Sequence, residues 1–174
     1  MFPGIYESIQ KSLLELYIFV TILIHKTIMA YSTILISIDG SECSLNAVNK
    51  GIELAKELSA DVILLCVIDM TTMVDNAAVG AIIDKDIDLV FKEEAEQVLQ
   101  NAIKKYPYPK ATLICEEGIP QEAINSIAER RNADLIIMGT HGRTGLRHLF
   151  MGSVAEHVIR HSKIPVMIVT TSED

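Results

Sequence analysis

The stretch that decides the fold is residues 134–153, which read DLIIMGTHGRTGLRHLFMGS. An apolar run, Asp134–Met138, leads straight into a first glycine, and an amphipathic segment begins at the last one. This pattern predicts a strand, a glycine-containing loop and a helix. Glycines at such a junction let backbone N–H groups approach an oxyanion, and the helix start adds its positive dipole end. The stretch favours an anion-binding loop; the alternative is that the glycines only turn the chain and Ser153 only caps the helix.

The glycine spacing also carries a family resemblance. The pattern Gly-x-x-Gly, nine residues, then Gly-Ser is formed here by Gly139, Gly142, Gly152 and Ser153. It resembles the nucleotide-binding signature of the universal stress protein family, in its ATP-binding branch, and the resemblance covers roughly residues 31–172. The stretch matches neither a Walker A loop, because no Lys-Ser or Lys-Thr follows a glycine, nor the Rossmann fingerprint Gly-x-Gly-x-x-Gly.

The resemblance implies an ATP site, with Mg²⁺ brought by the triphosphate rather than held in a protein cage. In such a site, Asp39 lies on the adenine and ribose side and the backbone of Val67 meets the adenine edge. Residues 140–143 and 152–154 hold the phosphates from two sides. The full set of residues expected at the site is Ser37, Ile38, Asp39, Val67, Met138, Gly139, Thr140, His141, Gly142, Arg143, Gly152, Ser153 and Val154. From the residues alone, Asp39 beside a glycine is also a common Asx-turn or helix cap.

The chain between residues 31 and 172 alternates short apolar runs with amphipathic segments. Because the strands are apolar on both faces, we predict an α/β fold: a single doubly wound domain with a parallel sheet and helices on both faces. The expected strands are Thr33–Ile38, Asp61–Ile68, Ala111–Cys115, Asp134–Met138 and Pro165–Thr170. The expected helices run from Ser41 or Ser44 to about Leu58, from the end of a long loop to about Lys105, from Pro120 to about Arg130, and from Ser153 to His161.

The resemblance implies a five-stranded sheet of order 3-2-1-4-5, similar to adenine nucleotide alpha hydrolases. Ligands of such sheets bind beyond the carboxyl ends of the strands, where the strand order reverses. With this order, the reversal lies between the strand that ends at Asp39 and the strand that ends at Gly139.

In the helix that ends near Lys105, the periodicity places the following residues inward: Val90, Phe91, Ala95, Val98, Leu99 and Ala102.

Composition limits the partners and the compartment. The formal net charge of −8 and the pI near 5.1 argue against a nucleic-acid surface. The three cysteines form no Cys-x-x-Cys pair, and Cys66 and Cys115 lie in apolar strands, so we expect buried thiols and a reducing cytoplasm. His157 and His161 share a helix face but have no third ligand nearby in the sequence, so we expect no metal site there.

Residues 1–30 differ from the rest of the chain. A dense apolar block runs from Leu13 to Ile24 and is interrupted by Glu15. The block is too short to span a membrane, and the charges before it suit a signal peptide poorly. It is either a result of start-codon choice upstream of Met29 or a real helix that packs on a partner, and the sequence leaves both open.

The predicted function is an ATP-binding regulatory module of the stress response, with little or no ATP hydrolysis and unknown protein partners. A slow ATPase with His141 as base, and a dimeric interaction module without nucleotide, are the alternatives. The strand Pro165–Thr170 is apolar and would form a sheet edge, which favours a homodimer; alternatively, the N-terminal segment covers this edge.

Overall fold

The computed structural model describes residues 10–21, 31–71, 85–140 and 151–170. The chain forms two compact units, Met1–Ala30 and Tyr31–Asp174. In the first unit, residues 10–21 form a helix whose large apolar side chains are exposed. Across the described segments, no helix is both long and apolar enough to cross a membrane.

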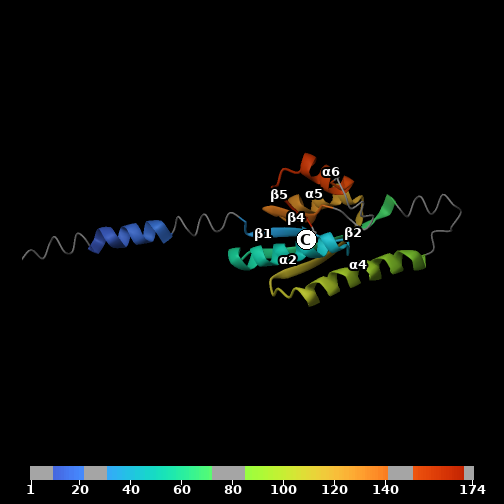
Figure 1. Cartoon of the computed structure of the whole chain (residues 1–174), viewed down its shortest axis with the longest axis horizontal. Helices are drawn as coiled ribbons and strands as arrows, with labels where there is room; N and C mark the ends of the chain where they lie inside the picture. Colours follow the sequence, from blue (N-terminus) through green and yellow to red (C-terminus); the bar gives the residue numbers. More distant parts are fainter. Residues whose placement is uncertain (1–9, 22–30, 72–84, 141–150, 171–174) are drawn as a thin grey trace, which may run out of the picture. The chain divides into compact units, whose positions relative to one another are not determined.

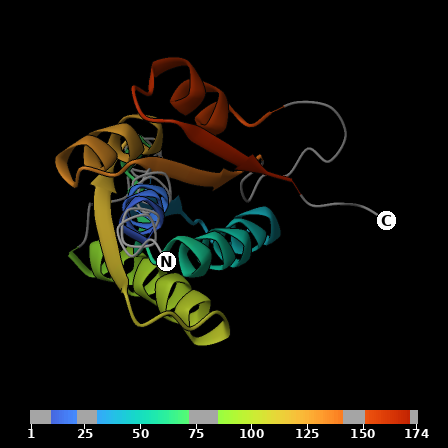
Figure 2. The same cartoon turned by 90° about the vertical axis from the view of Figure 1, so that its left-hand side faces the viewer.

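The second unit is built on a parallel sheet of five strands in the order β3-β2-β1-β4-β5. This order confirms the predicted sheet, and it leaves β3 and β5 at opposite edges (Figure 2). The middle of the central strand is fully buried, with Ile34, Leu35 and Ile36 at 0% exposure, because helices cover both faces. The strands are β1 (Thr33–Ser37), β2 (Asp61–Asp69), β3 (Ala111–Gly118), β4 (Leu135–Gly139) and β5 (Val166–Val169).

The helices form two layers around the sheet. Helices α2 (Glu42–Leu58) and α4 (Lys85–Lys105) pack on one face with Ile34 and Ile36. Helices α5 (Pro120–Arg130) and α6 (Ser153–His161) pack on the other face with Leu35 (Figure 1). Successive side chains of β1 therefore point to opposite faces of the sheet: Ile34 and Ile36 belong to one core and Leu35 to the other.

Three sequence predictions need correction. Val90 is 60% exposed rather than inward, because the buried stripe of α4 runs through Ala95, Leu99 and Ala102. Strand β3 continues beyond Cys115 to Gly118, and the Cys115 thiol is only half-buried. Burial, and then the nearby carboxylates of Glu96 and Glu117, raise the pKa of this thiol, so it carries little thiolate at neutral pH.

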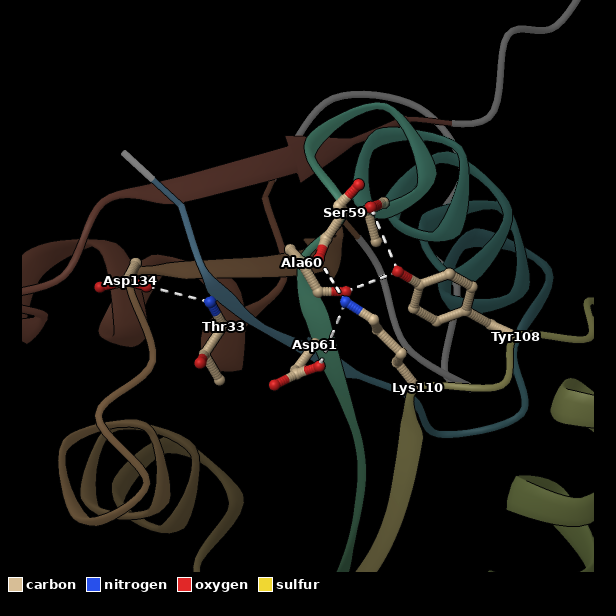
Figure 3. A network of polar contacts seen from close by, with 8 residues as sticks. Thr33, Ser59, Ala60, Asp61, Tyr108, Lys110 and Asp134 are labelled. Atoms are coloured by element: carbon tan, nitrogen blue, oxygen red, sulfur yellow. Dashed lines mark hydrogen bonds and ion pairs between the residues drawn. The ribbon is translucent and has the colours of Figure 1, made fainter. Parts of the chain in front are cut away.

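Side-chain contacts at the amino ends of the strands join elements that are distant in sequence (Figure 3). The carboxylate of Asp134 accepts bonds from the Ser32 N–H at 2.8 Å, the Ser32 hydroxyl at 2.7 Å and the Thr33 N–H at 2.9 Å. Burial alone would raise the pKa of Asp134, but these hydrogen bonds outweigh it and hold the pKa below its usual range. The Tyr108 hydroxyl donates to the Ala60 carbonyl at 2.6 Å. These bonds fix the entry into β1 and the turn before β2 at the end of the sheet where strands begin.

Candidate functional site

A cavity of about 460 Å³ opens where the carboxyl ends of β1 and β4 lie side by side. Its volume is within the usual range for small-molecule sites. The ends of the strands and the residues just after them supply its floor at residues 37–39, 66–69 and 138–140. Its walls come from Ser44 of α2, one side of α4 and the starts of α5 and α6. The cavity lies at the strand-order reversal that the family resemblance implied.

Every predicted site residue that the structure describes lines this one cavity. They are Ser37, Ile38, Asp39, Val67, Met138, Gly139, Thr140, Gly152, Ser153 and Val154. The other predicted residues, His141, Gly142 and Arg143, lie outside the described residues.

The cavity has further lining residues that the sequence analysis did not assign to it. They are Ser44, Cys66, Ile68, Asp69, Phe91, Glu94, Ala95, Pro120, Ile124 and Ala155. Ile68 and Asp69 could have been found by extending the strand that contains Val67 to its carboxyl end. Phe91 and Glu94 carry no such signal, because only the folded chain brings α4 to this wall.

Gly139 is where strand β4 meets the first turn of α2. A Cβ built on Gly139 would lie 2.9 Å from both the carbonyl carbon and the Cβ of Cys43, and 3.1 Å from the Ser44 nitrogen. These distances are shorter than nearly all real Cβ contacts; two of the atoms belong to the backbone of α2, and the third, the Cβ of Cys43, is bonded directly to it. The glycine is therefore required for close packing of α2 against β4, beyond any approach of its N–H to a ligand.

The start of α2 is satisfied by its own residues. Ser41 is the N-cap, and its side chain accepts a bond from the Ser44 N–H. The Asp39 carboxylate accepts from the Ser41 N–H at 2.9 Å, which is the Asx-turn expected as the alternative role for Asp39. Gly40 between them has φ 83°, a conformation that a glycine adopts without a Cβ penalty. Asp39 thus shapes the turn and lines the cavity at the same time.

The start of α6 is different, because its N-cap residue, Gly152, has no side chain that could cap the helix. The N-cap is thus Gly152 rather than Ser153, which corrects the capping role considered for that serine. The first residues of this helix line the cavity, so the positive end of the helix dipole lies there. An anionic group is the natural complement of such a helix end.

The two ends of the glycine segment are held together by the main chain. The Gly152 N–H donates to the Thr140 carbonyl at 2.8 Å, and the Thr140 N–H donates to the Val169 carbonyl at 3.1 Å. Thr140, just after β4, and Gly152, at the start of α6, are thus in direct contact. This closure puts the uncapped helix start beside the end of β4.

No group of three or more metal-ligating side chains occurs among the described residues. The rings of His157 and His161 stack with centroids 4.0 Å apart, and Nδ1 of His161 lies 2.8 Å from the His157 carbonyl oxygen. His161 lies in the last turn of α6, where basic side chains interact favourably with the helix dipole, and His157 lies one turn before it.

The fold and the cavity define a class of protein: a doubly wound α/β domain with a ligand crevice at the strand-order reversal. The family model described as the universal stress protein family matches residues 30–170. The chain belongs to the universal stress protein family.

Individual relatives agree with this assignment. Universal stress protein MJ0531 of Methanocaldococcus jannaschii is 38% identical over 141 residues, which are 80% of this chain and 82% of the relative. The solved structure of MJ0577 from the same organism has a TM-score of 0.71 and 33% identity, covering 83% of this chain and 99% of that one. A universal stress protein solved in complex with cAMP has a TM-score of 0.55 and 27% identity, covering 82% and 98%.

Proposed function

We propose that this protein binds ATP in the cavity between β1 and β4 and acts as a nucleotide-dependent regulatory module of the stress response. One observation supports this most: the uncapped N-terminus of α6 lines the same cavity as the ends of β1 and β4. A solved relative in complex with cAMP is consistent with an adenine nucleotide in this family.

The residues present suit the chemistry of a nucleotide. Ile38, Val67, Phe91 and Ile124 line the cavity with apolar side chains that suit a base. Asp39 and Gly139 line the same cavity, and the ribose would lie against them. The phosphates would lie against Gly152–Val154, Thr140 and the predicted contacts His141, Gly142 and Arg143. Mg²⁺ bound to the phosphates would neutralise part of their charge.

The proposal includes little or no hydrolysis. Three described carboxylates line the cavity, those of Asp39, Asp69 and Glu94. Two of them hold local turns: Asp39 accepts from Ser41, and Asp69 accepts from the N–H and the hydroxyl of Thr71. These bonds orient both carboxylates toward their own turns rather than toward an attacking water. ATP would then act by being bound rather than by being consumed.

The first experiment is purification of the full chain without added nucleotide, acid denaturation, and mass identification of the released small molecule. Calorimetry with Mg-ATP follows on the wild type, Gly152→Asp and Gly152→Ala. The backbone at residue 152 is extended, with φ −60° and ψ 149°, so an aspartate there would cap α6 and compete with a phosphate. We expect Gly152→Asp to be at least as stable as the wild type and to lose ATP affinity at least tenfold, while Gly152→Ala keeps most of it.

Equal ATP affinity in Gly152→Asp and the wild type would contradict phosphate binding at α6. A wild type that releases no nucleotide and binds no Mg-ATP would overturn the proposal and favour an interaction module. Release of ADP together with steady turnover that disappears in His141→Ala would favour the slow ATPase.

The same proposal includes a cytoplasmic homodimer paired through β5. This strand is at the edge of the sheet, is apolar throughout, and exposes Met167 by 38%. Such an edge favours pairing with a second copy. The cysteines are free thiols, which fits a reducing compartment. Light scattering of the full chain tests the dimer, and a monomer at high concentration would contradict it.

A further inference from the structure

Thr140 connects the proposed nucleotide site to the edge strand β5 through its main chain. Its carbonyl accepts the N–H of Gly152, the N-cap of α6, at 2.8 Å. Its N–H donates to the carbonyl of Val169, the last residue of β5, at 3.1 Å. One residue therefore joins the helix start that would hold phosphates to the end of the strand that would pair with a second copy.

A second connection reaches the same end of β5 from helix α2. The side-chain amide of Asn46, on α2, donates to the Thr170 carbonyl at 2.8 Å. Asn46 lies one turn after Cys43, whose backbone packs against Gly139, and Gly139 is the register partner of Val169. The carboxyl end of β5 is thus held by residues that contact or adjoin the cavity.

The strand that these bonds hold is short. Strand β5 has four residues, and the contacts from Thr140 and Asn46 act on Val169 and on the residue after it. If these contacts loosen, the ordered edge of the sheet shortens by a large fraction of its length. A shorter edge offers fewer main-chain groups and less apolar surface to another strand.

We propose that nucleotide occupancy controls self-association through both connections: a ligand that fixes Thr140 and Gly152 also fixes the carboxyl end of β5, which Asn46 must hold as well, and strengthens the pairing of this strand with a second copy. This inference rests on the proposed function. The coupling is reciprocal, so the dimer binds the nucleotide more tightly than the monomer does. A ligand shifts such an equilibrium only by its difference in affinity for the two states.

The test measures the dimer dissociation constant of the full chain by sedimentation over a dilution series, with and without saturating Mg-ATP. Coupling between sites commonly corresponds to roughly 5–150-fold, so we expect Mg-ATP to lower this constant at least about fivefold. The test variant is Asn46→Asp, which places a carboxylate against the Thr170 carbonyl instead of a donor. We expect it to bind Mg-ATP normally in dilute calorimetry and to reduce the effect on dimerisation below about twofold.

Asn49→Asp is the matched control. It lies on the same helix and makes the same charge change, and within the described residues its side chain makes no hydrogen bond. We expect it to keep the full effect of Mg-ATP.

The outcomes separate the two proposals. Mg-ATP binding without any change in the dimer constant overturns the coupling and leaves the proposed function standing. A chain that stays monomeric at all concentrations with Mg-ATP bound also overturns the coupling. Absence of Mg-ATP binding overturns both proposals. Full coupling in Asn46→Asp excludes the connection through α2 and contradicts the inference as stated.

Discussion

Replacing Gly139 with alanine tests whether the end of β4 must pack against the backbone of α2. The added Cβ would lie 2.9 Å from two carbon atoms of Cys43 and 3.1 Å from the Ser44 nitrogen. Carbon atoms prefer separations of about 3.5–4.0 Å, so the first turn of α2 must move away by several tenths of an ångström. No flexible side-chain end is available among these atoms to absorb the change.

The expected magnitude follows from two opposing effects. Overpacking of this kind costs roughly 1–3 kcal/mol. Replacing a glycine with alanine also restricts the unfolded chain, which returns about 0.4–1 kcal/mol where the backbone is compatible. With the middle of each range, about 2 kcal/mol minus about 0.7 kcal/mol, the net loss in the free energy of unfolding is about 1.3 kcal/mol. At roughly 2–4 °C per kcal/mol for a domain of this size, Tm should fall by roughly 3–5 °C.

The assay is thermal unfolding of the full chain, followed by circular dichroism, with Gly118→Ala as the matched control. The nearest atom to a Cβ at Gly118 is the Ala123 Cβ at 3.6 Å, an ordinary contact. We expect this control to be neutral or to gain up to about 1 kcal/mol. Since Ser44 lines the cavity, Gly139→Ala should also weaken Mg-ATP binding. A Tm within 1–2 °C of the wild type (about the shift produced by a few tenths of a kcal/mol) would refute the packing argument.

The remaining predictions concern the polar contacts at the amino ends of the strands and the orientation of α4. Asp134→Asn should cost about 0.5–1.5 kcal/mol at pH 7. Because the pKa of Asp134 is lowered in the folded state, the ionised carboxylate stabilises the fold above about pH 4, and this stabilisation is lost as the pH falls through the folded-state pKa. In urea unfolding, the difference in free energy of unfolding between the wild type and Asp134→Asn should therefore be smaller at pH 3 than at pH 7. Tyr108→Phe should cost about 0.5–1.5 kcal/mol with an unchanged urea m-value, because it removes the hydroxyl bond to Ala60. Leu99→Ala should cost about 2–5 kcal/mol and Val90→Ala less than about 0.5 kcal/mol; equal losses would contradict the observed face of α4.

The strands of the sheet could be predicted because the chain buries them on both faces. Continuous apolar runs such as Ile34–Ile36 and Val62–Leu65 occur where helices cover the sheet on both sides. The order of the strands came from the family resemblance, and the structure confirms it. Residue patterns alone give the alternation of strands and helices but leave the order of strands open.

The end of β3 could not be predicted from its residues, because it carries charges. Glu116 and Glu117 interrupt the apolar pattern, and the predicted strand therefore ended at Cys115. The structure keeps both in the strand: Glu116 pairs with Arg130 of α5 at 2.7 Å, and Glu117 pairs with Lys92 of α4 at 2.7 Å. Because β3 is an edge strand, both carboxylates remain partly in water, and the ordinary cost of burying a charge does not arise.

The floor of the cavity could be predicted and its wall could not. Residues at the ends of β1 and β4 are fixed by the strand positions, so the rule of strand-order reversal finds them. The side chains of Phe91 and Glu94 reach the cavity only because α4 packs along β2 and β3. That placement depends on the path of the chain between β2 and α4, which local periodicity does not encode. The wrong prediction for Val90 has the same cause, because the periodicity did not show which side of α4 faces the sheet. Val90 is exposed, although the next residue, Phe91, lines the cavity.

The capping of the two helices explains which of them is suited to bind an anion. After β1 the chain supplies its own acceptors: Ser41 caps α2, and Asp39 accepts from the next turn. Before α6 it supplies Gly152, which has no side chain to cap the helix. A glycine at the N-cap costs only a few tenths of a kcal/mol relative to Ser, Thr, Asn or Asp, but it leaves the acceptor of those side chains missing. A bound phosphate would supply that acceptor, so we expect the ligand to stabilise the α6 end and to change the α2 end little. This difference between Ser41 and Gly152 leads us to expect the response to the proposed ligand at the junction of β4, α6 and β5 rather than at the start of α2.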